Sequence, residues 1–100
     1  MARSYYSEFV QHCMRFYARH PKPNYFQKES DKKNWLSCRN ALKDFSYHEK
    51  DLLLQVYREG DTIPDNVYQV AKRNNIKQDS LWKLIGDLEH KVAKRRGLIG

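Results

Sequence analysis

The residues best suited to chemistry in this chain follow a predicted turn in its carboxyl-terminal half. Lys77, Gln78, Ser80 and Lys83 fall within a stretch of seven residues. A lysine can contact a phosphate or a guanine edge, a glutamine pairs well with adenine, and a serine can contact either a phosphate or a base. We therefore predict that these four side chains contact duplex DNA.

A second group of cations, Lys94, Arg95 and Arg96, closes the same predicted helix. Positive charge at the carboxyl end of a helix complements the helix dipole. Adjacent cations also suit a phosphate backbone. The sequence leaves both interpretations open, and we include these three residues in the predicted DNA-binding set.

The residues around the predicted turn have the spacing of two helices that cross closely. Ala71 suits a close crossing, and Asn75 is the candidate for a left-handed turn residue. Ile76 should fill the space beneath the turn, while Leu81 and Leu84 repeat at helical spacing and should face the first helix. This pattern predicts a helix-turn-helix, a unit that places its second helix in the major groove.

Two further side chains of this segment have more than one interpretation. Trp82 could touch a sugar or a thymine methyl group, or it could anchor the core, and we favour packing. Asp79 is a poor neighbour for phosphate, but it could cap its own helix or accept a hydrogen bond from a cytosine amino group.

Cysteines and histidines give little indication of a metal site or an enzyme. Cys13 and Cys38 lie on apolar helical stripes and belong to no zinc-binding spacing, so we predict buried free thiols. A metal site formed by His12, His48 and the two cysteines would match no recognised ligand spacing, so we do not expect one. The sequence contains no catalytic triad pattern and no glycine-rich phosphate loop, so we expect no cofactor and no enzymatic activity.

Charge is concentrated in the half of the chain that contains the predicted turn. The net charge is +7, and residues 67–100 carry eight Lys or Arg against three Asp or Glu. Residues 1–66 carry eleven against nine. A basic surface beside a candidate recognition helix favours binding to nucleic acid.

Length and composition favour one all-α domain over residues 1–100. The chain has only four glycines and three prolines, and long alternating β-branched runs are absent. No apolar run approaches membrane-spanning length, and no signal-peptide pattern opens the sequence. We therefore expect a cytoplasmic protein of about five helices.

The first forty residues predict two helices and leave their role unassigned. The first helix should span about residues 5–19 and end before Pro21 and Pro23, because proline cannot continue a helix. The second should begin near residues 30–31. Their apolar stripes comprise Tyr6, Phe9, Val10, Cys13, Met14 and Tyr17 in the first, and Trp35, Cys38, Ala41, Leu42 and Phe45 in the second.

Capping signals divide the remaining chain into three helices. Ser46 and Glu49 form a predicted capping box at the start of the third helix, and Gly60 suits a left-handed position at its end. Pro64 fits the first turn of the fourth helix, which should end near residues 73–74. The fifth helix should run from residue 78 or 79 to 96 and stop at Gly97. Because the fifth helix is longer than the fourth helix can cover, its second half should pack on the amino-terminal helices or on a second copy of the chain.

Residues 41–98 resemble region 4 of the sigma-70 family of RNA polymerase sigma factors. The resemblance rests on the helix pattern from Ala41 to Gly60, on the run Val67-Tyr68-Gln69-Val70-Ala71, and on the turn that follows. It implies a module that binds promoter DNA in the major groove and packs on the polymerase β-flap. Asn74 and Asn75 stand where the family favours an apolar residue and a glycine, which predicts a looser or differently wound turn.

The chain has no room for the other regions of a sigma factor, so the resemblance implies a small regulator of the type found in bacterial phages and mobile elements. The function predicted is DNA binding by the helix that starts near Gln78, with a homodimer as a possible form. The alternative is a protein-interaction module that binds RNA polymerase or inhibits another protein. Thirteen aromatic residues, seven of them tyrosine, favour that alternative.

Overall fold

The computed structural model describes residues 5–22, 26 and 28–99, and the regular secondary structure of these residues is entirely helical. Its elements are α1 (Ser7–Arg19), α2 (Glu29–Leu42), α3 (Tyr47–Arg58), α4 (Ile63–Arg73) and α5 (Gln78–Arg96). The predicted all-α class and the prediction of five helices are confirmed.

The predicted helix boundaries agree with the structure to within two residues. α1 begins at Ser7 and α2 at Glu29, and α4 and α5 have the predicted bounds. α1 ends at Arg19, with His20 as its cap, which agrees with the stop expected from Pro21. Pro23, the second residue of that stop signal, lies outside the described residues.

Local capping signals account for several helix ends. The Glu49 backbone N–H donates to Ser46 Oγ (3.2 Å), and the Ser46 backbone N–H donates to Glu49 Oε1 (2.9 Å), so the predicted capping box is formed. Pro64 occupies the first turn of α4. Gly97 follows α5 in the left-handed region with φ 85°, which confirms its predicted role.

The predicted left-handed conformation of Gly60 is wrong, because the end of α3 is stabilised by side chains. Glu59 leaves the helix in an extended conformation, and Gly60 has no positive φ. The Asn66 Nδ2 group donates to the carbonyl oxygens of Val56 (2.9 Å), Glu59 (3.1 Å) and Asp61 (3.2 Å). Buried carbonyls need a partner. The amide of the buried Asn66 supplies the donor for these carbonyls, so the end of α3 does not need a left-handed glycine.

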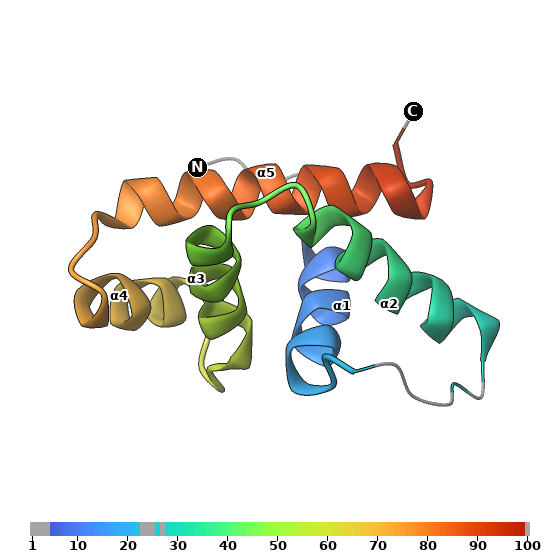
Figure 1. The fold of residues 1–100 in the computed structure, drawn as a ribbon, viewed down its shortest axis with the longest axis horizontal. Coiled ribbons are helices and arrows are strands. Elements are labelled where there is room, and N and C mark those ends of the chain that lie inside the picture. The colour runs from blue at the N-terminus through green and yellow to red at the C-terminus, as the bar shows by residue number, and fades with distance from the viewer. Residues whose placement is uncertain (1–4, 23–25, 27, 100) are drawn as a thin grey trace.

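α5 lies along one side of the molecule, and α1, α2 and α3 extend away from it (Figure 1). Beyond the turn, α4 folds back beneath the amino end of α5 and packs on α3. The carboxyl half of α5 packs on α2, so the prediction that it meets the amino-terminal helices is confirmed. Among the described residues, the opposite side of α5 carries exposed side chains, including Asp79, Lys83, Asp87 and His90.

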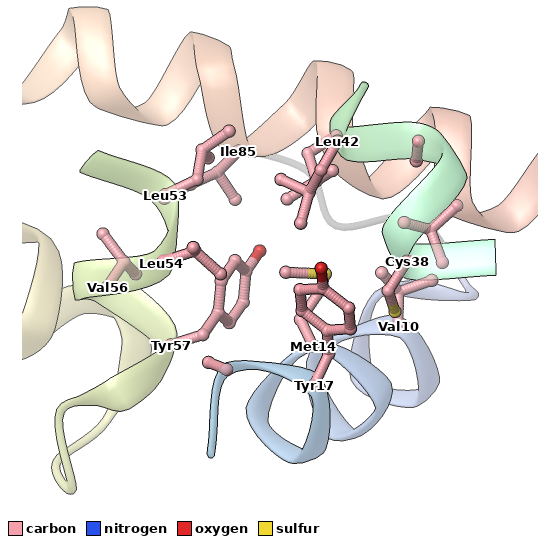
Figure 2. Close-up of a cluster of buried hydrophobic side chains, with 14 of the residues drawn as sticks. Val10, Met14, Tyr17, Cys38, Leu42, Leu53, Leu54, Val56, Tyr57 and Ile85 are labelled. Atoms are coloured by element: carbon pink, nitrogen blue, oxygen red, sulfur yellow. The ribbon is translucent and has the colours of Figure 1, made fainter. Parts of the chain in front are cut away.

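The hydrophobic core takes buried side chains from all five helices. Figure 2 shows Met14 and Leu42 beside Leu53 and Tyr57 of α3, with Val10 farther from α3 on the α2 side. These five residues are fully buried. Burying one such side chain contributes about 1.5–3 kcal/mol relative to leaving it exposed. This core therefore holds the helices against one another.

Phe9 departs from the predicted core stripe of α1. It is 39% exposed, although Val10 and Met14 of the same helix are fully buried. At 100° per residue, Phe9 lies at the edge of the stripe rather than at its centre. Phe16, seven residues later, is 40% exposed on the same edge.

A polar contact also joins α1 to α5. Glu89 is buried on α5 and accepts hydrogen bonds from Ser7 Oγ (2.8 Å) and Gln11 Nε2 (3.2 Å). A buried carboxylate is stabilised by such donors. Among the described residues, no helix has the length and apolar character needed to cross a membrane.

Candidate nucleic-acid interface at the turn between α4 and α5

A four-residue turn, Asn74 to Lys77, joins α4 to α5 and has a defined backbone conformation. Asn75 adopts φ 55°, so the predicted left-handed residue is confirmed. The Ile76 backbone N–H donates to the Ala71 carbonyl at 3.0 Å, which closes the turn. Asparagine enters the left-handed region more readily than most residues that carry a Cβ atom, which explains how Asn75 replaces a glycine here.

The residues predicted to build this corner pack as expected. Ala71 and Leu81 are buried, at 2% and 0% exposed. Ile76 and Leu84 are half-buried against the core. Trp82 is also half-buried and packs on the core, in agreement with the favoured interpretation of that residue.

A polar network fixes the turn to α3. Gln55 Oε1 accepts hydrogen bonds from Asn74 Nδ2 (3.0 Å) and from Arg73 Nη2 (2.9 Å) and Nε (3.3 Å). Arg73 also pairs with Glu59 at 3.1 Å. The Asn74 side chain donates to the Val70 carbonyl at 2.8 Å as well. The polar residue at position 74 therefore has structural partners in Gln55 and Val70.

The four principal DNA-contact candidates lie together and face solvent. Lys77, Gln78, Ser80 and Lys83 are all exposed, at the turn and along the first two turns of α5. In the described part of the chain, their side chains form no ion pair and no hydrogen bond with another residue. Their donors are therefore available to a ligand.

Lys72 and Tyr68 lie on α4, the helix that precedes this turn, and the sequence indicated no DNA contact for either residue. Both are exposed, and the Lys72 ammonium lies 5.8 Å from the centre of the Tyr68 ring, within cation–π range. The spacing of these two residues in the sequence could have indicated the pair, because an aromatic residue and a lysine four positions apart share one face of a helix.

The other three predicted DNA contacts lie at the far end of α5. At 1.5 Å per residue, Gln78 and Arg96 are separated by about 27 Å along the helix. Lys94 and Arg95 are exposed and Arg96 is half-buried. Arg95 lies 3.9 Å from Asp44, and Arg96 Nε donates to Asn34 Oδ1 at 2.6 Å. The structure therefore does not bring these cations together with Lys77 and Lys83.

Searches against protein-family models, curated proteins and solved structures found no match.

The two thiols are buried, as predicted, and both cysteines are free. Burial raises the pKa of Cys13 from 9.0 to about 11, an effect that the nearby Arg96 charge partly opposes. Burial likewise raises the pKa of Cys38, and neighbouring Cys13 adds to that rise. A thiol that stays protonated at neutral pH is a poor nucleophile and a poor metal ligand. The described residues include no group of three or more His, Cys, Asp or Glu that could hold a metal ion.

Proposed function

We propose that this protein binds duplex DNA through the turn between α4 and α5 and the first two turns of α5, and that it acts as a transcriptional regulator. The observation that carries the proposal is the exposed group Lys77, Gln78, Ser80 and Lys83, whose side chains have no intramolecular partner among the described residues. Between residues 66 and 86 the chain has four Lys or Arg and one acid, Asp79. This surface therefore attracts a polyanion.

The shape of this end of the molecule suits the major groove. An α-helix with its side chains is about 10–12 Å wide, and the major groove is about 12 Å wide. Lys77 and Lys83 would contact phosphates or guanine edges, Gln78 would pair with an adenine, and Ser80 would contact a phosphate or a base. Asp79 would accept a hydrogen bond from a cytosine amino group.

The amino end of α5 also offers backbone donors. Its N-cap residue, Lys77, makes no side-chain capping hydrogen bond, so the N–H groups of the first turn are not capped in this way. Free N–H groups and the positive end of the helix dipole favour a phosphate. With the lysines beside them, they would fix the position of a DNA strand.

The fold gives this surface a rigid support. Leu81 and Ile85 are buried behind the exposed side chains, and the Gln55 network holds the turn to α3. Because the backbone beneath these side chains is already ordered, binding requires ordering of the side chains but not of the helix. The resemblance of residues 41–98 to sigma-70 region 4 agrees with this proposal and suggests promoter DNA as the target.

The proposal can be tested by selecting duplexes from fragmented bacterial genomic DNA with the immobilised protein. Binding of a selected duplex is then measured by fluorescence anisotropy over a range of salt concentrations. Lys77→Ala/Lys83→Ala should weaken binding and reduce the slope of log K against log salt by about 1.8, since each lost phosphate contact removes about 0.9.

A matched control for this test is Lys22→Ala/Lys28→Ala. It removes the same charge from exposed positions beside the link between α1 and α2. This control should bind with a nearly unchanged slope. Equal affinity and slope for wild type and Lys77→Ala/Lys83→Ala would contradict the proposal.

A second candidate function, binding to a protein such as RNA polymerase, is favoured by the exposed aromatic residues. Phe9 and Phe16 share an edge of α1, and Tyr5 and Tyr47 are 82% and 92% exposed. Exposed aromatic groups are typical of protein-binding surfaces. Purified bacterial RNA polymerase core enzyme, tested without DNA, should then bind the wild type but not Phe9→Ser/Phe16→Ser. Binding that is absent or unaffected by these changes would count against this candidate.

A further inference from the structure

A basic depression lies between α2 and the carboxyl end of α5, at the opposite end of α5 from the proposed DNA contact. Its volume is about 440 Å³, and it is lined by Lys33, Leu36, Ser37, Asn40, Arg95 and Arg96. This volume is within the range of about 300–1,000 Å³ that is usual for ligand pockets. The four α2 residues have the spacing that places side chains on one face of a helix.

The charge around this depression is strongly positive. Asp44 is shared by two cations, with Lys91 Nζ at 3.3 Å and Arg95 Nη2 at 3.9 Å. Lys33 and Arg96 form no ion pair within the described ranges. Three cations, Lys33, Arg95 and Arg96, therefore line the depression, and its lining includes no acid. The dipole of α5 opposes an anion here with about half a negative charge, which is small beside this excess.

Arg96 is held in a fixed position with part of its guanidinium unused. Its Nε donates to Asn34 Oδ1 at 2.6 Å, and its two Nη atoms have no hydrogen-bond partner among the described residues. An arginine anchored in this way presents two parallel donors, the geometry that matches two oxygens of a phosphate. Asn40 likewise has no side-chain partner in the described part of the chain, and it adds an amide donor to the lining.

We propose that this depression is a binding site for a phosphate group, with Arg96 as the bidentate donor and Lys33 and Arg95 as the neutralising charges. The phosphate could belong to a nucleic-acid backbone or to a small phosphorylated molecule. The site does not depend on DNA contact by Lys77 and Lys83, since these lysines lie roughly 18–28 Å from Arg95 and Arg96 along α5.

The test uses the full chain labelled with ¹⁵N and titrated with pyrophosphate at constant ionic strength, with chloride as the reference anion. Pyrophosphate should produce saturable shifts of the amide signals of Asn34, Ser37, Asn40 and residues 95–96. Lys33→Gln/Arg96→Gln should weaken this binding about tenfold or more, because charge-assisted hydrogen bonds are lost. Circular dichroism checks that the variant is folded, and Arg96→Lys should bind more weakly than wild type because a lysine offers no bidentate donor pair.

Two arms separate the sources of the phosphate. If the ligand is a nucleic-acid backbone, Lys33→Gln/Arg96→Gln should also weaken binding of a duplex and reduce its salt slope. If it is a small phosphorylated molecule, pyrophosphate binding should fall while duplex binding stays unchanged. Shifts that do not saturate, that chloride reproduces, or that appear equally around Lys77 and Lys83 would overturn the proposal. The pyrophosphate result does not depend on whether the amino end of α5 binds DNA.

Discussion

The two ends of α5 carry similar cations in different surroundings. At the amino end, Lys77 and Lys83 extend into solvent with no partner in the described part of the chain. At the carboxyl end, Arg95 lies near Asp44 and Arg96 is hydrogen-bonded to Asn34. From the sequence, both groups are predicted to contact DNA. Tertiary neighbours decide which charges are free to move toward a ligand and which are fixed in place.

The supports of the two ends also differ. The amino end rests on α4 and on the network from Gln55 of α3, whereas the carboxyl end packs on α2. Changes beneath one end should therefore alter that end's ligand contacts more than those of the other.

The largest effect is expected from truncating the fully buried leucines Leu81 and Leu88, one beneath each half of α5. Leu81→Ala and Leu88→Ala should each lower the free energy of unfolding by about 2–5 kcal/mol, because a buried side chain is replaced by a cavity. Urea unfolding followed by circular dichroism measures this loss. Under conditions where both variants stay folded, Leu81→Ala should reduce DNA affinity more than Leu88→Ala. Equal affinities would show that the two ends are not independent.

Alkaline pH should destabilise the fold through its buried thiols, because burial raises the pKa of Cys13 and Cys38. The folded chain holds Cys13 with a pKa of about 11, against 9.0 as its ordinary value, so the unfolded chain releases this proton first. Below pH 9 the thiol is protonated in both states and does not change the free energy of unfolding. Between pH 9 and 11 that free energy falls by on the order of 2 kcal/mol, because only the unfolded chain releases the proton. The free energy of unfolding, measured from pH 8 to 11, should fall less steeply for Cys13→Ala. The same slope in both proteins would rule out a contribution from Cys13.

A smaller effect is expected at the two left-handed residues that border α5. Gly97→Ala should cost about 1–2 kcal/mol from backbone strain alone, since no atom lies within 4 Å of the added Cβ. Asn75→Ala should cost about 1 kcal/mol or less, because asparagine already carries a Cβ atom there. Thermal unfolding distinguishes the two variants. A larger loss for Asn75→Ala would mean that its side chain contributes more to the turn than its backbone conformation does.

Much of the fold could be predicted because its signals are local. The Ser46 capping box, the left-handed Asn75, the stop at Gly97 and the buried Leu81 depend on residues close together in sequence. The spacing of apolar residues also identified the second half of α5 as needing a partner, and that partner is α2.

The features that sequence did not reveal depend on residues far apart in the chain. Gln55 meets Arg73 and Asn74 only after α3 and α4 have packed, and Asn66 replaces a glycine cap because its amide reaches three carbonyls. For the candidate site, sequence predicted the exposed group at the amino end of α5. It could not separate that group from Arg96, since the position of Asn34 is set by the packing of α2.

The most direct measurement is a map of the DNA-bound surface by ¹H–¹⁵N spectra of the labelled full chain with a duplex selected from genomic DNA. If the amino end of α5 is the reading surface, the largest and saturable shifts fall on residues 72 and 75–84. Lys77→Ala/Lys83→Ala should then abolish those shifts. A selected duplex that leaves these signals unchanged, or that shifts mainly α1, would contradict DNA recognition by this helix.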